Sequence, residues 1–278
     1  MDMASTLKHL KLPEVATDPA PLPQFAWKYF EEAGTKTYSL ETETGATMTL
    51  QCPRLQLDAA RANTDRCHVT TDGQLANSPA SRQRRHSGRL REYWGTCAST
   101  PIPLPPPRSV VTPASHIPRY WETQSRVGVV RGGLGWLVLE MGVAEESHVD
   151  SSWCVFRQGR SWCVSVVGCT THQVSLCTWV CQQGEGGKCY TNTMSDIPGT
   201  QATLHYGVVL DVGRGRLAFI DLDREIVLAK VDVEFSESLH PMFGVGSPGN
   251  YTVNMKVKSG ADINMTDTKK SLIYDALK

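Results

Sequence analysis

Hydrophobic and polar residues alternate along much of this chain, and the clearest case is residues 204–221. Apolar residues recur there up to residue 211, the segment Gly213–Gly215 interrupts them, and the alternation resumes at Leu217. A period of two is typical of a strand with one buried face, and glycines supply the positive-φ positions of a tight reversal. The stretch therefore predicts a β-hairpin whose Leu210 and Phe219 lie in the core.

The same alternation predicts further strands before and after this hairpin. They are expected at residues 37–41, 47–50, 120–130, 136–144, 152–155, 161–166, 176–181, 226–231 and 251–255. Helical periodicity is weak and is found only at residues 6–12 and near the C-terminal end. The pattern predicts an all-β fold, a two-layer antiparallel β-sandwich with long loop insertions, whose facing sheets bury alternate residues about 10 Å apart.

Other segments lack this alternation. Residues 1–24 are rich in proline and are interpreted as a linker, and residues 261–278 as a polar tail outside the core. Residues 76–117 contain an arginine run and then a proline run, and residues 168–203 form a second insertion of a length that is usually functional or mobile. The arginine run is interpreted as a solvated loop, with a phosphate or acidic-partner contact as the alternative; the proline run is a tether or, alternatively, an SH3 or WW ligand.

Charge and cysteine content narrow the function classes. Lys and Arg number 28, as do Asp and Glu, so the formal net charge is zero. This balance argues against binding to nucleic acid or to an anionic membrane. We find no signal-peptide h-region and no apolar run of membrane-spanning length, so we expect a cytoplasmic chain whose nine cysteines are reduced thiols.

Motifs for catalysis are not found. The sequence has no G-x-S-x-G elbow, no Walker phosphate loop and no H-E-x-x-H, so we expect no enzyme activity and no cofactor. The carboxylates near the hairpin end lack calcium-loop spacing and are interpreted as solvated turn residues. They are Asp211, Asp221, Asp223 and Glu225.

Residues 169–189 are rich in cysteine and histidine. Thiolate and imidazole are the ligands that zinc prefers, so a zinc-binding or hydrolytic protein using this segment is the alternative function. The paired C-x2-C knuckles of zinc ribbons are missing, however, and we favour cysteines that fill strand positions as small buried residues, with no metal. The residues concerned are Cys169, His172, Cys177, Cys181 and Cys189.

Four runs in order resemble a known family. Residues 57–73 resemble the PRY segment, since Leu-Asp-Ala stands where Leu-Asp-Pro is expected and Thr-Asp-Gly closes it. Residues 119–123 resemble the strand that opens an SPRY domain, and residues 207–219 resemble its Gly-Val-x-Leu-Asp hairpin. Residues 235–243 match its F-x3-L-x-P-x-F run. The chain thus resembles PRY-SPRY proteins of the tripartite-motif (TRIM) and butyrophilin type.

This resemblance implies a domain layout and a role. The PRY-SPRY domain, a concanavalin-like jelly roll, would cover residues 55–260, with the insertions at 76–117 and 168–203. Residues 25–54 would be a short β segment that resembles a fibronectin type III remnant. The family implies a non-catalytic module that binds another protein, either as the substrate- or partner-binding part of a TRIM-like ubiquitin ligase or as a stand-alone adaptor. Ubiquitin ligase components are among the implied partners, and ligase activity would need a RING supplied by a longer chain or a partner.

Six residues are candidates for the partner-binding face, because Trp and Arg dominate interface hot spots and the segment 244–250 is a loop. They are Trp153, Arg157, Trp162, Trp179, Gly246 and Asn250. The alternative for Trp153 and Trp162 is burial within a sheet. A third possible class is an extracellular lectin-like sandwich, which a titration of free thiols distinguishes from a cytoplasmic protein.

Overall fold

The computed structural model describes residues 34–41, 45, 47–78, 87–105, 117–133, 136–169, 172 and 174–278, apart from the side chains of residues 186, 188 and 191. Residues 33–278 belong to one compact unit. The predicted linker at 1–24 lies outside the described residues. So do the first part of the arginine run and the end of the proline run of the 76–117 insertion.

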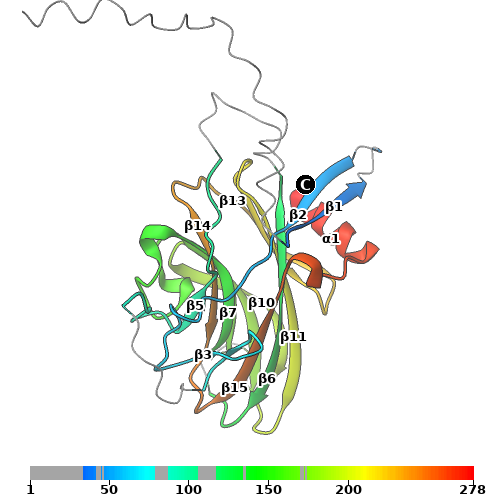
Figure 1. Cartoon of the computed structure of the whole chain (residues 1–278). Coiled ribbons are helices and arrows are strands. Elements are labelled where there is room, and N and C mark those ends of the chain that lie inside the picture. Colours follow the sequence, from blue (N-terminus) through cyan, green and yellow to red (C-terminus); the bar gives the residue numbers. More distant parts are fainter. Residues whose placement is uncertain are drawn as a thin grey trace, which may run out of the picture. The chain divides into compact units, whose positions relative to one another are not determined.

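Two β-sheets form the body of the described chain (Figure 1). The first sheet has nine strands, with the order β13-β12-β11-β6-β15-β4-β3 and with β1 and β2 attached at β6. Its strands are β1 (Lys36–Glu41), β2 (Thr47–Cys52), β3 (His68–Val69), β4 (Leu75–Ala76), β6 (Arg119–Val129), β11 (Gln201–Asp211), β12 (Arg216–Asp221), β13 (Ile226–Asp232) and β15 (Tyr251–Lys258). Apart from one parallel bridge between β2 and β6, the pairing in this sheet is antiparallel.

The second sheet has six strands in the order β10-β9-β8-β7-β14-β5, all antiparallel. They are β5 (Gly95–Cys97), β7 (Leu137–Glu145), β8 (Ser161–Gly168), β9 (Ser175–Gln182), β10 (Glu185–Ser195) and β14 (Leu239–Val245). The helical elements are η4 (Glu146–His148), η5 (Val155–Arg157), η6 (Gly260–Asp262) and α1 (Asp267–Leu277). The predicted all-β sandwich is therefore confirmed.

The sandwich core lies between the sheets, and the predicted hairpin is central to it. β11 and β12 pair with Leu210 opposite Leu217 and Val208 opposite Phe219. Leu210 and Phe219 are fully buried in the main hydrophobic cluster, as the alternation predicts. Burial of side chains of this size stabilises the fold by about 1.5 to 3 kcal/mol each.

The outer face of the first sheet is covered as well, which corrects the expectation of a polar C-terminal tail. Ile263, Ile273 and Ala276 are buried in a second cluster together with Leu40 and Leu50 of the β1–β2 hairpin. The C-terminal segment is thus part of the fold rather than a polar tail. Residues 36–52, in the segment expected to be a short β segment, form strands β1 and β2 and pack into the same compact unit (Figure 1).

One ion pair fixes α1 against the sheet. Thr266 caps the helix by accepting a hydrogen bond from the Lys269 backbone N–H, 3.3 Å away. The Lys269 ammonium then lies 2.7 Å from the fully buried Glu122 carboxylate of β6, which also accepts a hydrogen bond from the Tyr120 hydroxyl. A buried carboxylate needs such partners, because desolvation without them is costly.

The two predicted insertions are also more ordered than expected. Residues 175–195 form the β9–β10 hairpin at one end of the second sheet, so 168–203 is not a long loop. The earlier insertion contributes β5 and the fully buried Tyr93. In both segments, pairing with β8 or β14 gives hydrogen-bond partners to backbone N–H and C=O groups that would face solvent in a loop.

Two of the four turn carboxylates are not solvated, contrary to expectation. Asp211 and Asp221 are buried. Each accepts a hydrogen bond from the backbone N–H three residues later and faces the arginine at that position, Arg214 or Arg224. These carboxylates therefore hold the two β-turns closed.

Candidate partner-binding surface

Five side chains gather at one surface outside the second sheet, and we call them the tryptophan–arginine patch. The ring centroids of Trp94 and Trp153 are 4.9 Å apart, and those of Trp153 and Phe156 are 5.7 Å apart. The Arg66 guanidinium lies 4.3 Å from the Trp94 ring, and that of Arg157 lies 5.3 Å from Trp153. Cations are attracted to the faces of aromatic rings. The guanidinium groups and the rings of the patch therefore hold one another in place.

The patch combines exposure with apolar area. Both arginines are exposed, while the three rings are half-buried and so keep part of their surface open to solvent. Among the residues that the structure describes, neither Arg66 nor Arg157 forms an ion pair with a carboxylate. Interface hot spots are enriched in Trp and Arg, so aromatic rings beside guanidinium groups without a carboxylate partner are typical of a binding surface.

Backbone hydrogen bonds position the rings. The Trp94 N–H donates to the Trp153 carbonyl over 3.0 Å, and the Val245 N–H at the end of β14 donates to the Trp94 carbonyl over 3.0 Å. Nearby, one oxygen of Asp150 accepts from the backbone N–H groups of three successive residues, 91–93, at 2.8 to 3.0 Å. Successive N–H groups around one carboxylate form an anion-binding nest, which here fixes the segment that carries Trp94.

A buried carboxylate supports the other half of the patch. Glu140 of β7 is fully buried, and its Oε1 accepts a hydrogen bond from the Val155 N–H over 2.7 Å. Val155 begins η5, the short helix that presents Phe156 and Arg157. Burial raises the pKa of Glu140 to about 7, although the hydrogen bond from Val155 opposes the shift.

An outer hydrophobic cluster lies beneath the patch. Its members are Leu90, Tyr93, Cys97, Ala144, Val155, Cys163, Cys181 and Met242, with Phe156 and Trp179 packed against it. Trp179 is half-buried in β9, so it supports the surface from the sheet below. The predicted candidates Trp153 and Arg157 are thus in contact with each other, and Trp179 packs on the cluster that carries them. Their role in binding a partner stays a prediction.

Trp162 does not lie on this surface, which corrects its place among the candidates. Only 1% of Trp162 is exposed, and its ring meets Phe235 edge-on at 5.4 Å in the main core. The alternation along β8 explains this, since Trp162 and Val164 point inward while Cys163 points to the outer cluster. A side chain in this position cannot contact a partner.

The loop candidates have backbone roles. A Cβ at Gly246 would lie 1.7 Å from the Leu137 carbonyl oxygen. The backbone segments around Gly246 and Leu137 therefore approach too closely for any residue but glycine at this position. Gly246 is also buried, which removes it from the partner face. Asn250 is half-buried, and its carbonyl accepts hydrogen bonds from the N–H groups of Val130 and Arg131.

Sequence reasoning missed three members of the patch: Arg66, Trp94 and Phe156. Arg66 lies in the segment interpreted as a PRY turn, and Trp94 lies in the segment interpreted as an insertion. Trp94 directly precedes the short strand β5, which the sequence did not predict. No sequence pattern joins residues 66, 94 and 153–157, which the fold brings together.

Four of the five cysteine and histidine candidates also meet. The Nδ1 atom of His172 lies 3.3 Å from the Sγ atom of Cys169 and 3.3 Å from that of Cys177. With Cys189, their ligand atoms all lie within 4.8 Å of one another. Burial and the neighbouring thiols raise the pKa of Cys177 above its usual value. Cys181 is not part of this group, since it faces Cys163 in the outer cluster.

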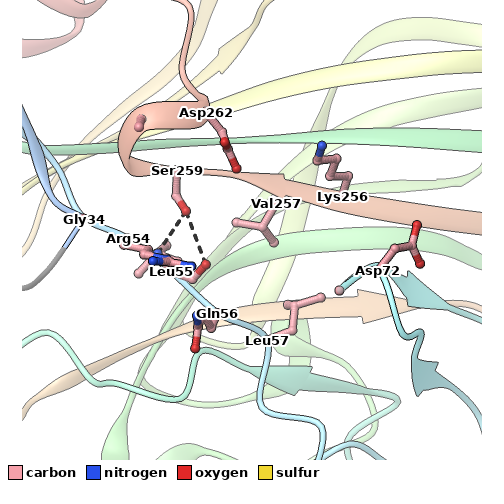
Figure 2. A pocket seen from close by; sticks show the side chains of 12 residues that line it. Gly34, Arg54, Leu55, Gln56, Leu57, Asp72, Lys256, Val257, Ser259 and Asp262 are labelled. Carbon is pink, nitrogen blue, oxygen red and sulfur yellow. Dashed lines mark hydrogen bonds between the residues drawn. The ribbon is translucent and has the colours of Figure 1, made fainter.

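A pocket of about 550 Å³ lies elsewhere, between residues 54–57, 72–73 and 256–262. Figure 2 shows the Ser259 hydroxyl at its wall, where it exchanges hydrogen bonds with the backbone of Leu55. The charged side chains around it are of both signs, among them Lys256 and Asp262. This mixture selects no ligand class, so the patch is the stronger candidate for binding.

Comparison with known proteins adds two similar structures. No family model matches the chain. The PSpry domain of TRIM65 is similar with a TM-score of 0.46 and 17% sequence identity, over 73% of this chain and 88% of that chain. A structure of stonustoxin is similar with a TM-score of 0.44 and 16% identity, over 73% of this chain and 27% of that chain. No described helix is long and apolar enough to cross a membrane.

Proposed function

We propose that this chain is a non-catalytic protein-recognition module of the PRY-SPRY type, in which the tryptophan–arginine patch contacts the partner. The observation that carries this proposal is the patch itself: open aromatic surface and exposed guanidinium groups on a backbone fixed by Asp150 and Glu140. Binding residues are commonly held on loops above a rigid scaffold, as here. Preorganised side chains also lose less entropy on binding.

The patch indicates the chemistry of its partner. Apolar area on Trp94, Trp153 and Phe156 suits an aliphatic or aromatic side chain, and Arg66 and Arg157 suit a carboxylate beside it. The partner surface is therefore acidic and partly apolar. Its binding should weaken as salt rises, because exposed charges are screened.

Proximity labelling or pull-down with a double variant tests this function. Trp153→Ala with Arg157→Ala removes one ring and one cation from the patch. The matched control is Trp136→Ala, because Trp136 is 48% exposed but does not belong to the patch. We expect a set of proteins that the wild type and the control capture and that the double variant loses, while the double variant stays folded with only a small drop in melting temperature.

Two outcomes would contradict the proposal. If the double variant captures the same proteins as the wild type, the patch is not the recognition surface. If the double variant unfolds, the two residues serve the core, and charge reversal at the exposed Arg66 and Arg157 then tests the surface without removing a ring.

We further propose that the module serves a TRIM-like ubiquitin ligase or acts as a stand-alone adaptor. The support is the order of the four family-like runs, three of which fall on β6, β11–β12 and β14 of the sandwich. Reconstituted ubiquitination of a captured partner, with and without a TRIM-type RING protein, tests this role. An adaptor that never recruits such a ligase would leave the partner unmodified.

We also propose a cytoplasmic location, supported by the burial of eight of the nine cysteines. Small buried thiols on strands are compatible with a reducing compartment. Titration of the denatured protein, without reductant, should find nine reactive thiols. One thiol or none would indicate a secreted, disulfide-bonded protein instead.

A further inference from the structure

A cysteine–histidine cluster shares no residue with the tryptophan–arginine patch and serves no role in the proposed recognition. Cys169 follows directly after β8, Cys177 lies in β9, and Cys189 lies in β10. His172 lies in the short connection between β8 and β9. The spacing C-x2-H-x4-C-x11-C thus brings ligands from three neighbouring strand segments to one point.

The distances in the cluster match those of a tetrahedral metal site. Zinc bonds of about 2.3 Å to sulfur and about 2.0 Å to nitrogen place neighbouring ligand atoms about 3.5 to 3.8 Å apart. The two contacts of His172 Nδ1 with thiol sulfurs measure 3.3 Å, and the whole set spans at most 4.8 Å. Small movements of side chains would therefore complete the coordination.

Burial indicates a structural site. Cys169 and Cys177 are fully buried, Cys189 is half-buried, and His172 is exposed, so the group is closed to solvent on one side by the sheet. The fold separates this cluster from Cys181, which sequence reasoning could not distinguish from its neighbours. Four protein ligands leave no open position for a substrate, and such closed sites stabilise structure rather than catalyse a reaction.

We propose that Cys169, His172, Cys177 and Cys189 bind one Zn²⁺ ion as a structural site. As each Zn–S bond forms, the thiol gives its proton to solvent, while the neutral imidazole binds through Nδ1. The ion would tie β10, at the end of the second sheet, to β9 and to the end of β8. This tie matters because the β9–β10 pairing contains three register irregularities.

Metal analysis of the intact chain tests the proposal. The protein is purified under reducing conditions after expression with added zinc, and its zinc content is measured. We expect about one zinc per chain in the wild type and in Cys181→Ala, the matched control from the same hairpin. Cys177→Ser and Cys189→Ser should bind zinc more than about tenfold more weakly, since even a lost outer partner of a metal ligand costs that much.

Two further readouts do not depend on whether a variant folds. Titration of the metal-free wild type with Co²⁺ should give the visible absorption of a tetrahedral, thiolate-bound ion. A chelator should lower the melting temperature of the wild type by more than about 5 °C, and added zinc should restore it.

Three results would overturn the proposal. One is a wild-type zinc content below about 0.1 per chain together with no cobalt spectrum. Another is a disulfide among the three cysteines, found by mass spectrometry, that persists in reductant with zinc present. The third is loss of metal from Cys181→Ala that equals the loss from Cys177→Ser. Zinc content and the cobalt spectrum do not depend on partner binding, so these results can fail while the recognition function stands.

Discussion

The same four-residue sequence occurs twice in this molecule, and its tryptophan is buried in one copy and partly exposed in the other. Ser-Trp-Cys-Val occurs at 152–155 and again at 161–164. Trp162 lies on the inward face of β8 and is buried, whereas Trp153 lies in a loop above the outer cluster and stays partly open. Local sequence could not separate them, because strand pairing with β7 and β9 decides which side chain points inward.

This difference gives a stability prediction. Trp162→Ala should lower the free energy of unfolding by about 3 to 5 kcal/mol, because it leaves a large cavity in the core. Trp153→Ala should lower it by less than about 1.5 kcal/mol, since part of that ring already contacts water. Urea denaturation of the two variants measures both values, and equal losses would mean that Trp153 belongs to the core.

Glu140 gives a prediction on pH. Its pKa in the folded protein is about 7, above its ordinary value of 4.5, so the folded chain binds this proton more tightly than the unfolded chain. The stabilising contribution is present below pH 4.5 and is lost as pH rises through 7. The loss in free energy of unfolding over this pH range is about 3 kcal/mol.

The variant Glu140→Gln isolates this effect. Gln keeps an oxygen to accept the hydrogen bond from Val155 but does not ionise. The free energy of unfolding of the wild type, relative to that of the variant, should fall between about pH 4.5 and about pH 7 and then level off. If the free energies of unfolding of the wild type and the variant change with pH in parallel, Glu140 does not cause the pH dependence.

At the scale of elements, the sequence predicted strands well and helix α1 poorly. Alternation identified β1, β2, β6, β7, β8, β9, β11, β12, β13 and β15, because each has at least one buried face. The strand expected at 152–155 is wrong, since this segment is a loop that leads into η5. α1 is short and mixes apolar with charged residues, so its sequence suggested a tail. Only the apolar outer face of the first sheet, with Val209 and Ile220, explains why Ile273 and Ala276 become buried.

The attachment of α1 yields a prediction with a neighbouring control. Lys269→Ala should lower the free energy of unfolding by about 3 kcal/mol, because it leaves the Glu122 carboxylate buried without its cation. Lys270→Ala should change stability little, since its pair with Asp267 is exposed. Chemical denaturation of both variants checks this. Equal effects would show that the Glu122 pair does not hold the helix.

For the whole molecule, the sequence predicted the fold class more completely than the site. The sandwich could be predicted because hydrophobic and polar residues alternate within each strand, which is a local property of the sequence. The patch depends on contacts between residues 66, 94 and 153–157, and the metal-ligand cluster depends on the register of β9 with β8 and β10. Such non-local contacts cannot be read from spacing alone, which is why Trp94 was missed and Trp162 was misplaced.

Recognition through the patch is the central claim, and the affinity of Trp153→Ala for a captured partner tests it most directly. Calorimetry on purified proteins compares this variant with the wild type and with Trp136→Ala. We predict that Trp153→Ala weakens binding by about 2 kcal/mol, roughly 30-fold in Kd, while Trp136→Ala binds as the wild type does. A folded Trp153→Ala variant with wild-type affinity would contradict the claim.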